Sequence, residues 1–142
     1  MSSMSLSKRK GSAHERALAN KLWDMGLAVL RGCSSGGGVR KRFVPDIVAM
    51  GPGFVLVLEV KYRSERGPVR IEEEKVEKLL EFARRAKGDA YIAVKFRGDD
   101  WRILPISDRG GVTIRPDDLG NAYTLEQLVN KYMSRSLTEY LK

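Results

Sequence analysis

The sequence has one cysteine and one histidine among its 142 residues. A single cysteine excludes an internal disulfide and is typical of a reducing compartment, so we expect a cytoplasmic location. Zinc sites built from cysteine and histidine need more such side chains than the sequence contains. Catalysis by a serine–histidine–aspartate triad would depend on His14 alone.

The sequence also has no long hydrophobic run. No apolar segment approaches the ~18 residues of a membrane-spanning helix, so we expect no membrane partner. The first ten residues, MSSMSLSKRK, contain basic side chains but no apolar stretch behind them, unlike a signal peptide. We expect residues 1–10 to be a flexible basic N-terminus and residues 11–142 to be a single domain, which is an ordinary size for one core.

Positive charge is unevenly distributed. The formal net charge is +8, and residues 1–45 contain nine Lys and Arg against two acidic residues. The remaining residues contain 17 Lys and Arg against 16 Asp and Glu, so they are nearly neutral. A concentrated basic segment favours a polyanionic partner such as nucleic acid, because cations placed against phosphates release condensed counterions. The alternative is a solvated basic surface without a partner.

Periodicity predicts the helices. Ser12-Ala13-His14-Glu15 has the S-x-x-E form of a capping box, and apolar residues then recur at helical spacing, which predicts a helix over 13–25. A second amphipathic helix is predicted within 72–88, with acidic residues in its first turn and basic residues in its last. Thr124 is placed to cap a third helix over 125–133.

Between these helices the sequence predicts strands. A short strand is expected over 27–31, and two apolar runs joined by Gly51-Pro52-Gly53 predict a β-hairpin over 44–62. Further strands are expected over 90–96 and 101–106, with a possible short one over 112–115. This order predicts an α/β domain with a central mixed sheet flanked by helices.

The hairpin carries three charged residues that a buried strand would not contain without a reason. Glu59 and Lys61 are two residues apart and therefore project to the same face, and Asp46 lies on the partner strand. A four-residue connection, Gly51 to Phe54, would place Asp46 directly opposite Glu59. A three-residue turn would place Asp46 opposite Leu58 and on the other face. Sequence alone leaves both registers open.

If the first register holds, two carboxylates converge beside an ammonium group. A hard cation such as Mg²⁺ is typically held by one or two carboxylates, with water and substrate phosphate completing its shell. Such an ion activates a bound water, and Lys61 could orient that water or stabilise developing charge, which is the outline of phosphodiester hydrolysis. The alternative for Asp46, Glu59 and Lys61 is a structural salt bridge at the sheet edge.

The pattern P-D…E-V-K, from Pro45, Asp46, Glu59 and Lys61, resembles the active-site motif of the restriction-endonuclease-like nuclease superfamily. Further segments are similar, in order, to the archaeal Holliday-junction resolvases: RKGSAHER, GLAVLRGCSS, PDIVA, LEVKYRS, EKLLEFARRAKG and YIAVKF. This resemblance covers Lys8 to Phe96. The loop SGGGVRKRF departs from the family's pattern.

The resemblance implies a restriction-endonuclease-like nuclease domain that acts as a Mg²⁺-dependent homodimer and makes paired, symmetric nicks in four-way DNA junctions. It implies that Glu15, Asp46 and Glu59 hold the metal and that Lys61 is the catalytic lysine. It makes Ser35 the catalytic serine, with the neighbouring Ser34 as the other candidate. On the residues alone, the favoured role of Glu15 is to close the capping box.

The resemblance also places basic residues on the side of the DNA. The expected phosphate contacts are Arg9, Lys10, Arg16, Arg31, Arg40, Lys41 and Arg42. Two other functions remain open: a related nuclease for other branched or linear DNA, and a non-catalytic architectural DNA-binding protein.

Overall fold

A computed structural model of the chain describes the backbone of residues 3–32 and 42–140 and the side chains of residues 11–32 and 42–135. The helices are α1 (Ser3–Asp24), α2 (Glu73–Ala86) and α3 (Leu125–Tyr140), with a short 3₁₀ helix at Pro116–Asn121. The strands are β1 (Ala28–Arg31), β2 (Ile47–Gly51), β3 (Phe54–Arg63), β4 (Val69–Ile71), β5 (Asp89–Phe96), β6 (Arg102–Ile106), β7 (Val112–Ile114) and β8 (Tyr123–Thr124).

Six strands form the central sheet, in the order β1-β2-β3-β5-β6-β8. Strands β3 and β5 are parallel, and the other neighbours in this sheet are antiparallel. A parallel pair needs a crossover connection, and α2 provides it. Strands β4 and β7 form a separate two-stranded sheet. The sequence patterns predicted a strand at β7 but none at β4. The predicted mixed sheet flanked by helices is confirmed.

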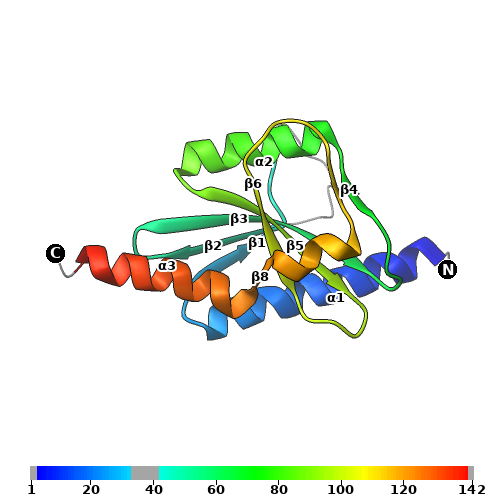
Figure 1. The fold of residues 1–142 in the computed structure, drawn as a ribbon, viewed down its shortest axis with the longest axis horizontal. Helices are drawn as coiled ribbons and strands as arrows, with labels where there is room; N and C mark the ends of the chain where they lie inside the picture. Colours follow the sequence, from blue (N-terminus) through cyan, green and yellow to red (C-terminus); the bar gives the residue numbers. More distant parts are fainter. Residues whose placement is uncertain (1–2, 33–41, 141–142) are drawn as a thin grey trace.

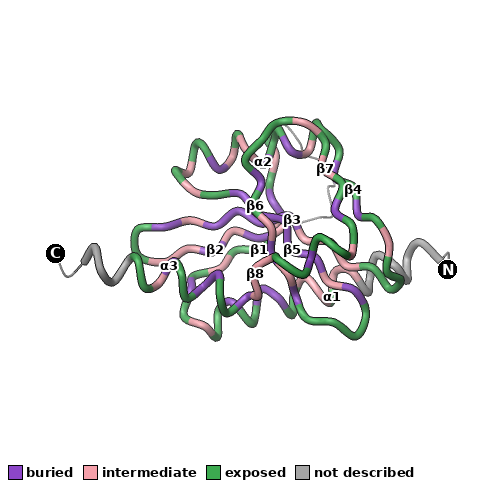
Figure 2. Tube along the Cα trace, viewed as in Figure 1, coloured by how far each residue is buried: buried purple, intermediate pink, exposed green. Residues whose placement is uncertain are grey.

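The helices cover opposite faces of the sheet: α1 and α3 lie on one face, and α2 lies on the other (Figure 1). Each face has its own apolar core, and many of the buried residues lie on the strands between the helices (Figure 2). On β3, Leu56 and Leu58 pack with the α1 and α3 side, and Val57 packs with the α2 side. Glu59, two residues after Val57, therefore belongs to the α2 face.

The β2–β3 hairpin has the register that brings the charged residues together. Gly51 pairs with Phe54 and Ile47 with Leu58, so Asp46 and Glu59 come next and lie opposite each other. Between the strands, Pro52 is followed by Gly53 at a φ of 79°, the conformation that a type II turn requires at its third position. The four-residue connection weighed from the sequence is the one present.

Helix α1 begins much earlier than predicted. It starts at Ser3 rather than at residue 13, so Ser12 and Glu15 lie inside the helix and the predicted capping box is wrong. The helix passes through Gly11 at a cost of about 1 kcal/mol, which burial of Leu18 and Leu22 can offset. The helix thus begins within residues 1–10, whose flexibility stays a prediction.

Helix α3 begins as predicted. The Thr124 amide donates to Gln127 Oε1 at 2.9 Å, and the Gln127 amide donates to Thr124 Oγ1 at 3.1 Å. This reciprocal pair is a capping box. In the described part of the chain, every helix is too short or too polar to cross a membrane.

Candidate active site

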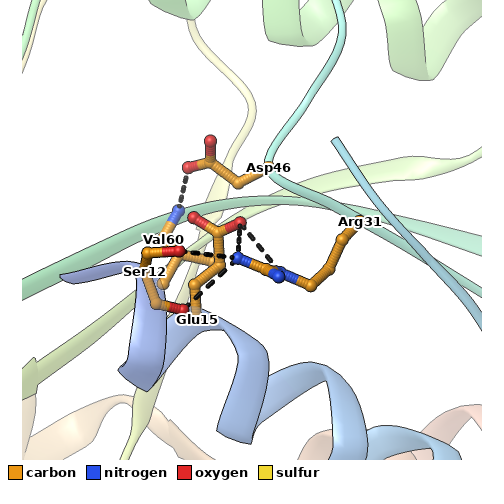
Figure 3. Close-up of polar contacts among 5 residues, drawn as sticks. All are labelled: Ser12, Glu15, Arg31, Asp46 and Val60. Atoms are coloured by element: carbon orange, nitrogen blue, oxygen red, sulfur yellow. Dashed lines mark hydrogen bonds and ion pairs between the residues drawn. The ribbon is translucent and has the colours of Figure 1, made fainter. Parts of the chain in front are cut away.

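Asp46 and Glu59 converge at the point where β2 begins. Asp46 Oδ2 accepts a hydrogen bond of 2.8 Å from the backbone amide of Val60, which fixes the direction of its carboxylate (Figure 3). Glu59 is 3% exposed and is the one buried charged residue among those the structure describes. A buried carboxylate next to a second one is costly without a cation, so this pair is the candidate site.

Two lysines flank the Glu59 carboxylate, one at each oxygen. Lys61 Nζ lies 3.4 Å from Oε2, and Lys75 Nζ, from α2, lies 4.0 Å from Oε1. Burial and then the charge of Asp46 raise the pKa of Glu59 to about 7, although both lysines act in the opposite direction. Desolvation therefore outweighs the two ammonium groups, and Glu59 titrates near neutral pH.

The donor set fits a hard divalent cation. Glu59 Oε1 is buried and accepts no hydrogen bond in the described part of the structure, which is rare for a buried carboxylate oxygen. A cation held between Asp46 and Glu59 would satisfy this oxygen and remove the repulsion between the two groups. Within residues 11–32 and 42–135, no set of three or more His, Cys, Asp or Glu side chains is arranged to hold a metal ion. Participation of Glu15 therefore stays a prediction.

Glu15 reaches the site from α1, on the other face of the sheet. Arg31 donates to Glu15 Oε1 from Nε at 3.2 Å, and its Nη2 lies 3.2 Å from the same oxygen (Figure 3). Arg31 Nη2 also donates to the Ser12 carbonyl and to Ser12 Oγ. Burial and then the charge of Asp46 raise the pKa of Glu15, and Arg31 partly opposes this. Glu15 is thus near Asp46, but its ion-pair partner is Arg31.

The structure describes some of the other predicted site residues and not others. Arg16 and Arg42 are exposed, and Lys61 is half-buried beside Glu59. Ser34, Ser35, Arg40 and Lys41 lie outside the described residues, as do the side chains of Arg9 and Lys10.

Sequence reasoning missed Lys75. Its position in the predicted second helix gave no signal of proximity to Glu59, because that contact depends on how α2 crosses β3.

A pocket of about 550 Å³ lies elsewhere along α2. It is lined by Phe43, Phe82 and Ala86 with the charged side chains of Arg42, Lys78, Glu81 and Arg85. Glu15, Asp46 and Glu59 do not line this pocket. The candidate site is therefore identified by its arrangement of charged groups and not by this pocket.

Comparison with known proteins gives the family. The model of the archaeal Holliday junction resolvase family, Hjc, matches residues 6–137. The crossover junction endodeoxyribonuclease Hjc of Sulfurisphaera tokodaii is 34% identical over 145 residues, which cover 97% of this chain and all of that protein. This chain belongs to the archaeal Holliday junction resolvase family. The Archaeoglobus fulgidus enzyme of the same name is 39% identical over 99 residues, which are 70% of this chain and 71% of that protein.

Solved structures agree with this family. The structure of Archaeoglobus fulgidus Hjc, a Holliday junction resolvase, matches with a TM-score of 0.70 and 27% identity and covers 84% of this chain and 94% of that one. The bacterial homing endonuclease I-Ssp6803I matches with a TM-score of 0.52 and 18% identity, covering 92% and 96% of the two chains, and bears on the fold alone. The restriction-endonuclease-like fold expected from the sequence is confirmed.

Proposed function

We propose that this chain is an endonuclease that resolves four-way DNA junctions by Mg²⁺-dependent hydrolysis of phosphodiester bonds. The observation that carries the proposal is the buried Asp46–Glu59 pair, in which Glu59 Oε1 accepts no hydrogen bond from the described residues. Family membership supports DNA junctions as the substrate. A structural salt bridge alone would leave no reason to bury an unsatisfied carboxylate oxygen beside a second carboxylate.

Each residue has a proposed role in this reaction. Asp46 and Glu59 would hold the Mg²⁺, with help from Glu15, and the bound ion would supply an activated water and polarise the phosphate. The Val60 amide keeps Asp46 Oδ2 directed into the site. Lys61, whose side chain is 25% exposed, can reach both Glu59 and a substrate, so its ammonium donates to the phosphate oxygen that gains charge.

Other parts of the proposal rest on the sequence. Ser35 is proposed as the catalytic serine. The described basic residues Arg16, Arg31 and Arg42, together with Arg9, Lys10, Arg40 and Lys41, are proposed to contact DNA phosphates.

The proposed assembly and location follow the same reasoning. A homodimer is proposed because a junction is close to two-fold symmetric and paired nicks need two equivalent sites, which a C₂ dimer supplies. A cytoplasmic location is proposed from the single cysteine.

The test compares a synthetic four-way junction with a linear duplex of the same sequence, in Mg²⁺ and in EDTA. We expect paired nicks in the junction in Mg²⁺ alone and little cleavage of the duplex. Asp46→Asn retains the shape of the side chain but loses its charge, so it should lower cleavage by orders of magnitude and leave junction binding in place. Equal cleavage of the duplex would instead favour a nuclease for other DNA. Tight binding without cleavage by the wild type would favour an architectural protein.

A further inference from the structure

Lys75 occupies an unusual position in the first turn of α2. Its ammonium nitrogen lies 4.0 Å from Glu59 Oε1 and 5.4 Å from the centre of the Phe43 ring. Phe43 lies three residues before Asp46, in the segment that enters β2. The Lys75 side chain therefore extends between the two parts of the chain that carry the central carboxylates.

Local structure gives no reason for a cation at this position. The N-terminal end of a helix carries partial positive charge and favours acidic residues, which α2 supplies at Glu73 and Glu74. Lys78, one turn further along, lies 3.0 Å from Glu74 Oε1 on its own helix. The ion pair found for Lys75 among the described residues is instead with Glu59, across the interface between α2 and β3. A residue that conflicts with its local environment is expected where function requires it.

The contact between Lys75 and Glu59 leaves hydrogen-bond donors of the ammonium group available. A separation of 4.0 Å is too long for a hydrogen bond, and the Lys75 side chain is 42% exposed. An ammonium has three donors, so Lys75 can bind a second, external group while it stays next to Glu59. Its neighbour Lys61 approaches the other oxygen of Glu59 and is also partly exposed. Two ammonium groups thus approach different oxygens of one buried carboxylate.

We propose that Lys75 binds a backbone phosphate of the DNA strand that is cut, next to the phosphate engaged by Lys61. This inference rests on the proposed nuclease function. The three carboxylates of Glu15, Asp46 and Glu59 repel the backbone that has to enter the site. The Lys75 ammonium, held beside the carboxylates by Glu59 and Phe43, offsets that repulsion and fixes the position of the DNA strand. The sequence gives no motif for this role.

Junction binding in EDTA tests this contact without cleavage. Each phosphate contact contributes about −0.9 to the slope of log K against log salt. Lys75→Met should make that slope shallower by about 0.9, and Lys75→Arg should restore it. Lys21→Met is the matched control: it removes one positive charge of similar exposure, 49%, from a lysine that pairs with Glu126 on α3, on the other face of the sheet. The control should leave the slope unchanged.

A scan with neutral methylphosphonates locates the contact. Each phosphate around the cleavage point is replaced in turn, and binding is measured for wild type and Lys75→Met. At the contacted phosphate, the replacement should weaken the wild type several-fold and leave the variant almost unaffected. If Lys75→Met and Lys21→Met give the same slope and no position behaves in this way, Lys75 is only a counter-ion of Glu59 and the inference is wrong.

Two further outcomes separate this inference from the proposed function. A wild type that binds the junction but does not cleave it in Mg²⁺ contradicts the proposed function, and the slope and scan still decide the role of Lys75. A wild type that does not bind junction DNA contradicts both. Thermal unfolding checks that Lys75→Met is folded, and Lys75→Gln replaces it in both measurements if it is not.

Discussion

Glu15 and Arg31 are 16 residues apart in the sequence and form an ion pair across the α1–β1 junction, with Arg31 Nη2 3.2 Å from Glu15 Oε1. Both were expected to have other partners, a metal ion for Glu15 and a DNA phosphate for Arg31. The same guanidinium also donates to Ser12 Oγ, at 3.2 Å. Arg31 therefore orients the Glu15 carboxylate, which is predicted to complete the metal site. A DNA phosphate would have to compete with Glu15 for the Arg31 guanidinium.

Replacing Arg31 by methionine should raise the pKa of Glu15 further. Burial and Asp46 already raise this pKa above its ordinary value, and the charge and hydrogen bond of Arg31 oppose that change. Carboxyl-carbon NMR titration of the metal-free protein measures the shift, with Glu15→Gln used to assign the signal. Arg16→Met, an exposed neighbour on α1, is the control and should have a smaller effect. An unchanged or lowered pKa would show that the ion pair does not persist in solution.

Metal-free protein should lose stability as the pH rises through the range in which Glu59 titrates. The folded-state pKa of Glu59 is about 7, against an ordinary value of 4.5. The folded state therefore binds more protons than the unfolded state between these values, and the free energy of unfolding falls as pH increases, by ~3 kcal/mol in total. Urea unfolding in EDTA at pH 5 and pH 8 measures this.

Glu59→Gln should remove most of that pH dependence and be more stable than the wild type at pH 8. Glu77→Gln, at an exposed glutamate of α2, is the control and should retain the wild-type profile. A wild type that is equally stable at both pH values would mean that Glu59 stays ionised in the folded protein.

Mg²⁺ should stabilise the folded protein, because an ion that binds only the native state adds about 2.7 kcal/mol at 100 times its dissociation constant. Thermal unfolding during Mg²⁺ titration measures the effect. Asp46→Asn and Glu59→Gln should abolish it. Glu15→Gln decides whether Glu15 is a ligand: a much weaker response to Mg²⁺ supports three carboxylates, and a wild-type response limits the site to two. A full response from Asp46→Asn would contradict the site itself.

The stability of the turn between β2 and β3 should depend on Gly53. Its φ of 79° is strained for a side chain that branches at Cβ, so Gly53→Val should lower stability by roughly 1–2 kcal/mol. A Cβ added at this position would have no atom of the described residues within 4 Å, so the cost would come from the backbone and not from a clash. Gly53→Asn should cost less, since asparagine tolerates this conformation. Chemical denaturation compares the two variants, and equal stability of Val and Asn would contradict the turn.

Most strands, and the two candidate registers of Asp46 against Glu59, could be predicted because they depend on local patterns. Alternation along β3 fixes which residues share a face, and a turn containing Pro52 and Gly53 limits the register to a few choices. The cap at Thr124 was predictable for the same reason, since both partners lie within one turn. The structure then selected one register from the two that the sequence allowed.

The start of α1 and the contact of Lys75 with Glu59 could not be predicted in this way. The S-x-x-E pattern at Ser12 and Glu15 is a local cap signal, but in the folded protein both side chains contact Arg31 on β1. Lys75 contacts Glu59 because the crossover helix α2 packs against β3, and this packing depends on the topology of the sheet. Contacts between distant segments decide both cases, and no short window of sequence contains them.

Strand β1 is an edge of the central sheet and is only four residues long, Ala28–Arg31. Short edge strands are among the first elements to open in a native protein, well before the central strands separate. Each such opening would carry Arg31 away from Glu15 and would also break the hydrogen bond from the Gly32 amide to the Asp46 carbonyl, while the β2–β3 pairing could stay closed. The ion pair of Glu15 therefore depends on a short edge strand, and amide exchange along β1 would measure how often that pair is released.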